Sequence, residues 1–275
     1  MKVGILGGGQ LARMMILDGL RLGLSFRVYD ESKHSSTEEF SDYCVGALDD
    51  KAKLLEFSKG LDVVTCEFEN IPASTLEIMG KNTQCYPPYE ALAAAQDRLD
   101  EKKMLQSLGI ATAEFYPVSD KSDLQPAGEA LGFPLILKTR RSGYDGKGQR
   151  VVKDSNQLET AWSEIGERPA IAEGFVNFIR ELSIIAVFGK NAQSAYYPLV
   201  ENEHENGILV KSMAPAEAKE TISKQARAAV DAIAKHYSYV GVLVAEFFQV
   251  GDKLLLNEIA PRVHNSGHWT IEGAL

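Results

Sequence analysis

Short apolar runs alternate with amphipathic segments from Met1 to about Tyr86, and this order constrains the fold more than any other feature. The apolar runs are VGIL, FRVYD, YCVGA and DVVTCEF, and helical patterns begin at Gln10, near Lys51 and after Pro72. A strand–helix–strand order predicts a parallel sheet with right-handed crossovers. Ligands of such sheets bind at the carboxyl ends of the strands.

The rest of the sequence predicts two further lobes, so the expected fold class is α/β with α+β lobes. We expect an N-terminal parallel α/β domain over residues 1–108, a small lobe over 109–176 and a larger lobe over 177–275. The larger lobe would end in a hairpin formed by Val242–Val250 and Lys253–Ala260. No repeat or flexible linker separates the three regions, so they are expected to pack closely.

A glycine-rich, basic loop joins two strand-like runs within PLILKTRRSGYDGKGQRVV, which spans Pro134–Val152. Gly143, Gly146 and Gly148 lack a Cβ, so the backbone can approach an anion and direct N–H groups at its oxygens. Positive charge is concentrated in the same stretch, at Lys138, Arg140, Arg141, Lys147 and Arg150. The spacing differs from that of the common P-loop. The glycines and basic residues together predict a hairpin that binds a triphosphate. The alternative is a hairpin whose basic tip is only solvated.

Composition limits the classes of function that this chain can have. The chain has 275 residues, a formal charge of −9 and a pI near 5.2, which argue against nucleic-acid binding. We expect a soluble, cytoplasmic protein, since no apolar run is long enough for a membrane span and Met1 leads directly into a strand. Cys44, Cys66 and Cys85 are too widely spaced to indicate disulfides or a zinc site.

Two glutamates in the final hairpin form the second chemical signal. Glu246 and Glu258 are equidistant from Asp252, so a connecting loop with an odd number of residues would place them directly opposite each other. Like charges repel at that distance, and a bound cation would offset the repulsion. Magnesium fits, with manganese as an alternative, and Asn257 could add a neutral oxygen ligand. A one-residue register shift, which would turn one glutamate to solvent, remains the alternative.

These signals together resemble the ATP-grasp superfamily, in which ATP lies between a small lobe and a larger, metal-bearing lobe. More narrowly, the sequence is similar to the 5-(carboxyamino)imidazole ribonucleotide synthetases of purine biosynthesis. The motifs that carry this resemblance occur in the family's order, at Gly7–Leu11, Glu67–Asn70, Gln96–Arg98, Gly143–Gln149 and Asn257–His268.

The resemblance implies an ATP site with magnesium bound by Glu246 and Glu258. The implied ATP contacts are Arg98, Lys138, Gly143, Tyr144, Asp145, Gly146, Lys147, Gly148, Gln149, Glu173, Gly174, Phe175, Val176, Glu181, His204, Asn257 and Glu258. Lys138 could neutralise the α- and β-phosphates. Without the resemblance, His204 among its acidic neighbours would be interpreted as a surface histidine.

The resemblance also implies bicarbonate and 5-aminoimidazole ribonucleotide as the other substrates. The γ-phosphoryl group would pass to bicarbonate, and the resulting carboxyphosphate would carboxylate the amine. The residues implied for bicarbonate and for the chemistry are Lys147, Asp145, Arg262, His264, Asn265 and Ser266. Those implied for the ribonucleotide are Gln10, Leu11, Glu67, Tyr144, Asp145 and Ser266. The sequence leaves open whether His264 or Asp145 moves the amine proton, and whether the chain forms a homodimer.

Three other functions stay open on the sequence. Gly7, Gly9 and Ala12, with Asp30 further on, approximate a dinucleotide fingerprint, so a NAD-dependent dehydrogenase is one alternative. Another is a different ATP-grasp carboxylate–amine ligase or a formate-using ribonucleotide transformylase, and a third is a module that binds ATP without turnover. We also expect the chain to lack a C-terminal segment of the family, which would weaken acceptor binding more than ATP binding.

Overall fold

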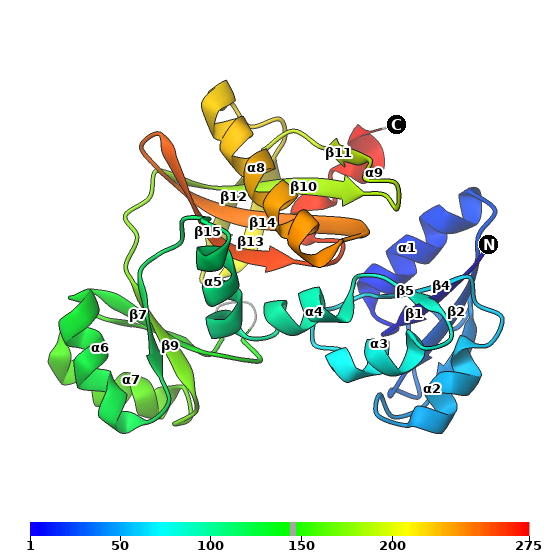
Figure 1. Cartoon of the computed structure of the whole chain (residues 1–275), viewed down its shortest axis with the longest axis horizontal. Coiled ribbons are helices and arrows are strands. Elements are labelled where there is room, and N and C mark those ends of the chain that lie inside the picture. The colour runs from blue at the N-terminus through cyan, green and yellow to red at the C-terminus, as the bar shows by residue number, and fades with distance from the viewer. Residues whose placement is uncertain (144–146, 275) are drawn as a thin grey trace.

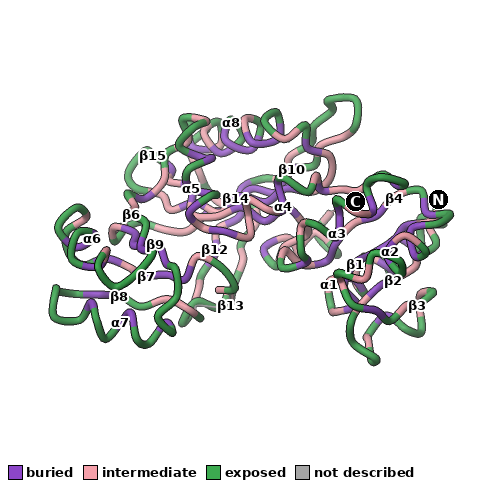
Figure 2. The backbone as a smooth tube through the Cα atoms, turned by 60° about the horizontal axis from the view of Figure 1, so that its bottom comes forward, coloured by how far each residue is buried: buried purple, intermediate pink, exposed green. Residues whose placement is uncertain are grey.

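The computed structural model describes residues 1–143 and 147–274 as three bodies, each built on its own sheet (Figure 1). The N-terminal domain lies at one end, the small lobe at the other, and the large lobe joins them. Within the described residues, no helix is both long and apolar enough to cross a membrane. Buried positions gather in the central strands of each body, while the outer helix faces are exposed (Figure 2).

The N-terminal domain is the predicted parallel sheet, with strand order β3-β2-β1-β4-β5. Fully buried residues form two clusters around this sheet, one with Ile5 and Val28 and the other with Leu6. The elements are β1 (Lys2–Leu6), α1 (Gln10–Arg21), β2 (Ser25–Asp30), β3 (Asp42–Val45), α2 (Lys51–Ser58), β4 (Val63–Cys66), α3 (Ala73–Met79) and β5 (Gln84–Cys85). The predicted α/β class is confirmed.

The small lobe is an antiparallel sheet in the order β6-β9-β7-β8, covered by two short helices. Leu135, Leu137 and Trp162 are buried between the sheet and these helices. The elements are β6 (Phe115–Val118), α6 (Leu124–Leu131), β7 (Leu135–Thr139), β8 (Gln149–Val152), α7 (Leu158–Glu164) and β9 (Ala170–Gly174). The glycine loop therefore connects the neighbouring strands β7 and β8, as predicted.

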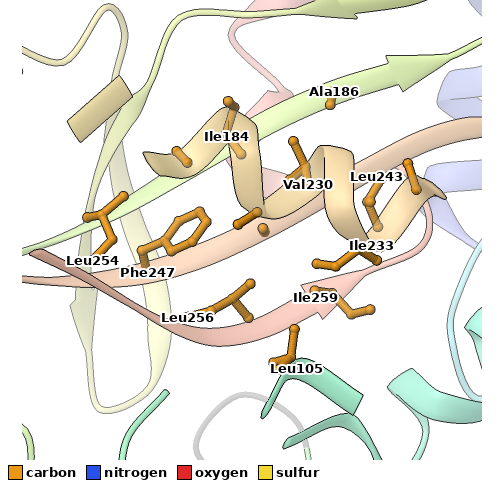
Figure 3. Packing of buried hydrophobic residues seen from close by; sticks show 14 of the residues in the cluster. Leu105, Ile184, Ala186, Val230, Ile233, Leu243, Phe247, Leu254, Leu256 and Ile259 are labelled. Carbon is orange, nitrogen blue, oxygen red and sulfur yellow. The ribbon is translucent and has the colours of Figure 1, made fainter. Parts of the chain in front are cut away.

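The large lobe is an antiparallel sheet in the order β13-β12-β10-β14-β15, with β11 beside β10. Helix α8 packs on one face of the sheet through Ile222, Val230 and Ile233 (Figure 3). The elements are β10 (Arg180–Phe188), β11 (Ser194–Tyr196), β12 (Val200–Glu205), β13 (Ile208–Met213), α8 (Glu220–Tyr237), β14 (Gly241–Val250), β15 (Lys253–Ala260) and α9 (Thr270–Gly273).

Two helices connect the N-terminal domain to the lobes: α4 (Tyr89–Ala95) and α5 (Arg98–Ser107). Helix α5 lies between the small lobe and the sheet of the large lobe (Figure 1). Its Met104 and Leu105 belong to the same core as Leu256 and Ile259 of β15. Residues of α5 can therefore contact both lobes at once.

Candidate active site

A cleft of about 420 Å³ opens where the small lobe, the large lobe and the end of the N-terminal domain meet. It gathers residues from motifs that are far apart in the sequence. The predicted site residues that line it are Arg98, Lys138, Gly143, Lys147, Gln149, Glu181, His204, Glu246, Asn257, Glu258, Arg262, His264 and Asn265. Most of the predicted ATP, metal and bicarbonate residues therefore share one cavity.

Other predicted residues lie outside the cleft lining. They are Gln10, Leu11, Glu67, Gly148, Glu173, Gly174, Phe175, Val176 and Ser266. Tyr144, Asp145 and Gly146 fall outside the described residues. The structure therefore brings the phosphate and metal parts of the predicted site together more fully than the parts assigned to adenine and to the ribonucleotide.

Lys138 stands at the end of β7, where its side chain is almost buried and pairs with Glu173 of β9. The Lys138 Nζ to Glu173 Oε2 distance is 2.9 Å. Burial alone raises the pKa of Glu173, but the charges of Lys138 and Lys102 outweigh it and lower the pKa below its ordinary value. The Glu173 carboxylate therefore lies beneath the cleft and fixes Lys138 from below, leaving the lysine at the cavity wall.

The root of the glycine loop is tied to α5 by Asp97, the residue that caps this helix. Arg140 donates to both oxygens of Asp97, at 2.9 and 2.8 Å, and Arg141 donates to one of them at 3.0 Å. Arg98 donates to the Thr139 carbonyl at 3.1 Å. Arg140 and Arg141 are thus directed at Asp97, and Arg140, Lys138 and Lys147 line the cleft.

Glu246 and Glu258 are directly opposite each other on β14 and β15, as predicted. The expected reason for this pairing, a connecting loop with an odd number of residues, was wrong. The turn has two residues, Gly251 and Asp252, since Val250 pairs with Lys253. A regular ladder from that turn would pair Glu246 with Asn257 and leave Glu258 facing the core. A β-bulge at Asn257 corrects the register, so that Asn257 and Glu258 both reach the cleft.

The chemistry of this pair fits a divalent cation. Burial and the nearby charge of Glu258 raise the pKa of Glu246 to about 8, which reflects the cost of holding two carboxylates together. A hard cation with oxygen ligands would offset that cost. Among the described residues no group of three or more His, Cys, Asp or Glu forms a metal site, so phosphate oxygens and water would complete the shell.

The polar residues after β15 are held in fixed positions around the carboxylate pair. Arg262 pairs with Glu69 of the N-terminal domain and donates to the Val263 carbonyl at 2.7 Å. His264 places Nε2 at 3.2 Å from Glu246 Oε1. Burial and the charge of Arg262 lower the pKa of His264 to about 4, so its imidazole is neutral near pH 7. Because Nδ1 accepts from the Ser266 N–H, the proton of the neutral ring lies on Nε2, which faces Glu246.

His204 and Ser266 have partners that their sequence context did not reveal. His204 of β12 pairs through Nδ1 with Glu181 of β10, and that hydrogen bond raises the pKa of His204. Ser266 is fully buried, and its Oγ lies 3.0 Å from His264 Nδ1. Ser266 can therefore orient the His264 ring.

Glu67 anchors the turn that follows β1. Its two carboxylate oxygens accept from the Gly9 and Ala12 N–H groups, at 2.7 and 2.8 Å, and so cap the start of α1. Asp30 accepts from the Gly8 N–H at 2.6 Å. The acidic residue of the dinucleotide-like pattern is therefore bound to the turn itself.

Sequence reasoning gave no role to three residues of the cleft. Phe178 and Phe248 stack with ring centroids 4.7 Å apart and supply an apolar wall suited to an adenine ring. Glu101 of α5 is buried and accepts from the Ile259 N–H at 2.8 Å. An aromatic residue in a strand or close to one is common in cores, and a helical glutamate is ordinarily solvated, so neither pattern indicated a site.

Comparison with known proteins agrees with this geometry. The family model of the ribonucleotide synthetase preATP-grasp domain matches residues 1–96, and that of the ATP-grasp domain matches residues 103–275. N5-carboxyaminoimidazole ribonucleotide synthase of Pseudomonas aeruginosa is 42% identical over 274 residues, covering 100% of this chain and 76% of that protein.

Solved structures give the same result. The N5-carboxyaminoimidazole ribonucleotide synthetase of Thermus thermophilus aligns with a TM-score of 0.93 and 48% identity, over 98% of this chain and 74% of that one. The Aspergillus clavatus enzyme in complex with ADP and 5-aminoimidazole ribonucleotide has a TM-score of 0.90 and 31% identity, over 99% and 72%. The chain belongs to the ATP-grasp enzymes, within the family of N5-carboxyaminoimidazole ribonucleotide synthetases.

Proposed function

We propose that this chain joins bicarbonate to the amine of 5-aminoimidazole ribonucleotide at the expense of ATP, releasing N5-carboxyaminoimidazole ribonucleotide, ADP and phosphate. The observation that carries the proposal is the opposed pair Glu246 and Glu258 in the same cleft as Lys138, Arg262 and His264. A polyphosphate needs the cations and the metal-binding carboxylates, and a small oxyanion beside it needs the guanidinium.

The nucleotide would lie along the cleft with its base against Phe178 and Phe248 and its phosphates toward Lys138. Lys138, fixed by Glu173, would bind phosphate oxygens, and Lys147 would approach them as the loop closes. Glu246, Glu258 and Asn257 would hold magnesium, which supplies charge neutralisation on the transferred phosphoryl group when bound. The protein then contributes mainly position and electrostatic stabilisation, and no protein nucleophile is required.

Bicarbonate would bind beside Arg262, whose guanidinium has a fixed orientation because it pairs with Glu69. A planar guanidinium can donate two parallel hydrogen bonds to a carboxylate-like anion. Attack on the γ-phosphoryl group gives carboxyphosphate, which is short-lived in water. Exclusion of water and closeness to the acceptor amine are therefore the main requirements of the second step. The amine proton would pass to His264, which lies 3.2 Å from Glu246, or to Asp145, which is outside the described residues.

The acceptor would enter from the N-terminal domain, at the carboxyl ends of β1 and β4. Gln10, Leu11 and Glu67 lie there, and the related Aspergillus enzyme was solved with the ribonucleotide. The chain spans about three quarters of the length of these relatives.

The test is an assay of ADP release with each substrate left out in turn. We expect ADP only when bicarbonate and 5-aminoimidazole ribonucleotide are both present. Formate or amino acids in place of bicarbonate separate a transformylase or another carboxylate–amine ligase from this reaction. Nucleotide binding without ADP under every combination would indicate an ATP-binding module. A change in nicotinamide absorbance would indicate a dehydrogenase.

A further inference from the structure

Lys102 of α5 is among the most deeply buried charged residues of the chain, with 1% of its surface exposed. It lies outside the cleft lining and outside every motif that the function uses. Its Nζ donates to the Asn257 carbonyl at 2.9 Å and to the Leu256 carbonyl at 3.3 Å. A buried ammonium is costly unless its donors are satisfied, so these two carbonyls fix its position.

The two carbonyls belong to the β-bulge of β15. Leu256 is the last regularly paired residue before the irregularity, and Asn257 is the extra residue. A bulge disrupts the ladder locally and leaves backbone groups without their usual partner. The Leu256 N–H donates to the Ala111 carbonyl on the side of β15 away from β14, and Lys102 binds the Leu256 and Asn257 carbonyls at the bulge. On the far side of the bulge, Glu101 accepts from the Ile259 N–H at 2.8 Å. Adjacent residues of α5 thus support the bulge before and after Glu258.

Lys102 also approaches Glu173, which belongs to the small lobe. Lys102 Nζ is 3.8 Å from Glu173 Oε1, while Glu173 Oε2 bonds Lys138. Among the described residues, that buried Oε1 atom has no hydrogen-bond partner, and the charge of Lys102 compensates it together with that of Lys138. A continuous set of contacts therefore runs from the phosphate-binding lysine to the strand of the carboxylate pair.

We propose that Lys102 is a positioning residue that holds the bulge at Asn257, and so the orientation of Glu258, while it anchors Glu173 beneath Lys138. This inference deepens the proposed function and rests on it. It predicts that loss of Lys102 weakens the increase in nucleotide affinity that magnesium causes, although Lys102 would touch neither the metal nor the nucleotide. A lysine that only filled core space would lower stability and leave that metal dependence unchanged.

The experiment measures binding of adenylyl-imidodiphosphate, an ATP analogue that does not transfer its γ-phosphoryl group, by titration calorimetry with magnesium and with EDTA. The readout is the ratio of the two Kd values. Lys102→Met should reduce that ratio by about tenfold to a hundredfold, the size typical when a partner behind a metal ligand is lost. The Kd in EDTA should change much less.

Two control variants separate positioning from general damage. Lys103→Met changes the exposed neighbour on the same helix and should keep the wild-type ratio. Leu105→Ala removes core packing from the same helix but leaves both carbonyl contacts in place, so it should lower the melting temperature and keep the ratio. Lys102→Leu, which also lacks an N–H donor, replaces Lys102→Met in the comparison if the methionine variant does not fold.

The outcomes are distinct. An unchanged ratio in the folded Lys102 variant would overturn the inference, and so would an equal loss of the ratio in Leu105→Ala. Absence of nucleotide binding by the wild-type chain in magnesium would instead remove the proposed function on which the inference rests.

Discussion

Glu246 and Glu258 face each other across the β14–β15 hairpin only because Asn257 is an extra residue in β15. The bulge places three oxygen-bearing side chains at one edge of the cleft, and it does so at the cost of opposing like charges. The opposed carboxylates lower the stability of the free chain, but they provide oxygen ligands for a divalent cation. The first prediction follows from that conflict.

Glu258→Gln should stabilise the free chain and impair its reaction. Removing one of two opposed charges relieves repulsion, worth up to about 1 kcal/mol for a cross-strand pair. Loss of a metal-binding oxygen should lower ADP release by about a hundredfold or more, since a bound metal contributes several kcal/mol to the transition state. Thermal unfolding and the ADP assay check the two halves. Glu203→Gln changes an exposed residue of β12 and is the control. It should change neither the melting temperature nor the rate of ADP release.

Glu69→Gln should raise the bicarbonate concentration needed for half-maximal ADP release by about tenfold, the effect of losing one charge-assisted hydrogen bond. The reason is that Glu69 fixes the Arg262 guanidinium, and a glutamine cannot pair with it as an anion. Nucleotide affinity should stay at the wild-type value, because Glu69 and Arg262 contact each other rather than Lys138. Equal losses in bicarbonate and nucleotide binding would contradict this assignment.

Lys147→Ala should slow turnover more than it weakens nucleotide binding. Lys147 is exposed at the mouth of the cleft, where it can approach the phosphates when the loop closes. An interaction made mainly in the transition state affects kcat rather than affinity. Single-turnover kinetics and calorimetry separate the two. Lys153→Ala, an exposed lysine beyond β8, should behave as wild type. A defect limited to affinity would count against the loop's catalytic role.

Stability should depend on pH through Asp97. Burial alone raises the pKa of Asp97, but the hydrogen bonds and charges of Arg140 and Arg141 outweigh it and lower the pKa. A carboxylate whose pKa is lowered on folding stabilises the chain above its unfolded value of about 3.9, and the effect is lost as pH falls through the folded value.

Asp97→Asn should therefore cost about 1–3 kcal/mol of unfolding free energy at pH 7, and the difference from wild type should shrink below about pH 4. Urea unfolding at a series of pH values measures it. Asp18→Asn, on the exposed side of α1, provides the comparison. A difference that grows on acidification would show that the sign is wrong.

The sequence predicted the parallel N-terminal sheet, the hairpin of β14 and β15 and most of the cleft, because these depend on local pattern and on motifs. Lys138 ends an apolar strand, and the two glutamates are equidistant from Asp252. Both features can be seen without tertiary information.

The rest depends on contacts between distant segments. Lys102 meets β15 across 155 positions of sequence, and a lysine in a helix is ordinarily assigned to the surface. The bulge at Asn257 has no sequence signature of its own, so a correct pairing was predicted from an incorrect loop length. Arg140 and Arg141 counted as phosphate-facing charges because their partner, Asp97, caps a helix in another part of the chain.

The pairing of Glu69 with Arg262 joins residues 193 positions apart, one in each of the two family domains. Chimaeras that recombine a first domain from one homologue with a second domain from another would have to inherit both halves of this pair. A swap that brings in a neutral residue at position 69 would leave the Arg262 guanidinium without this carboxylate beside the cleft, so a crossover at the domain boundary, residues 97–102, requires an acidic residue at 69 in one parent and an arginine at 262 in the other.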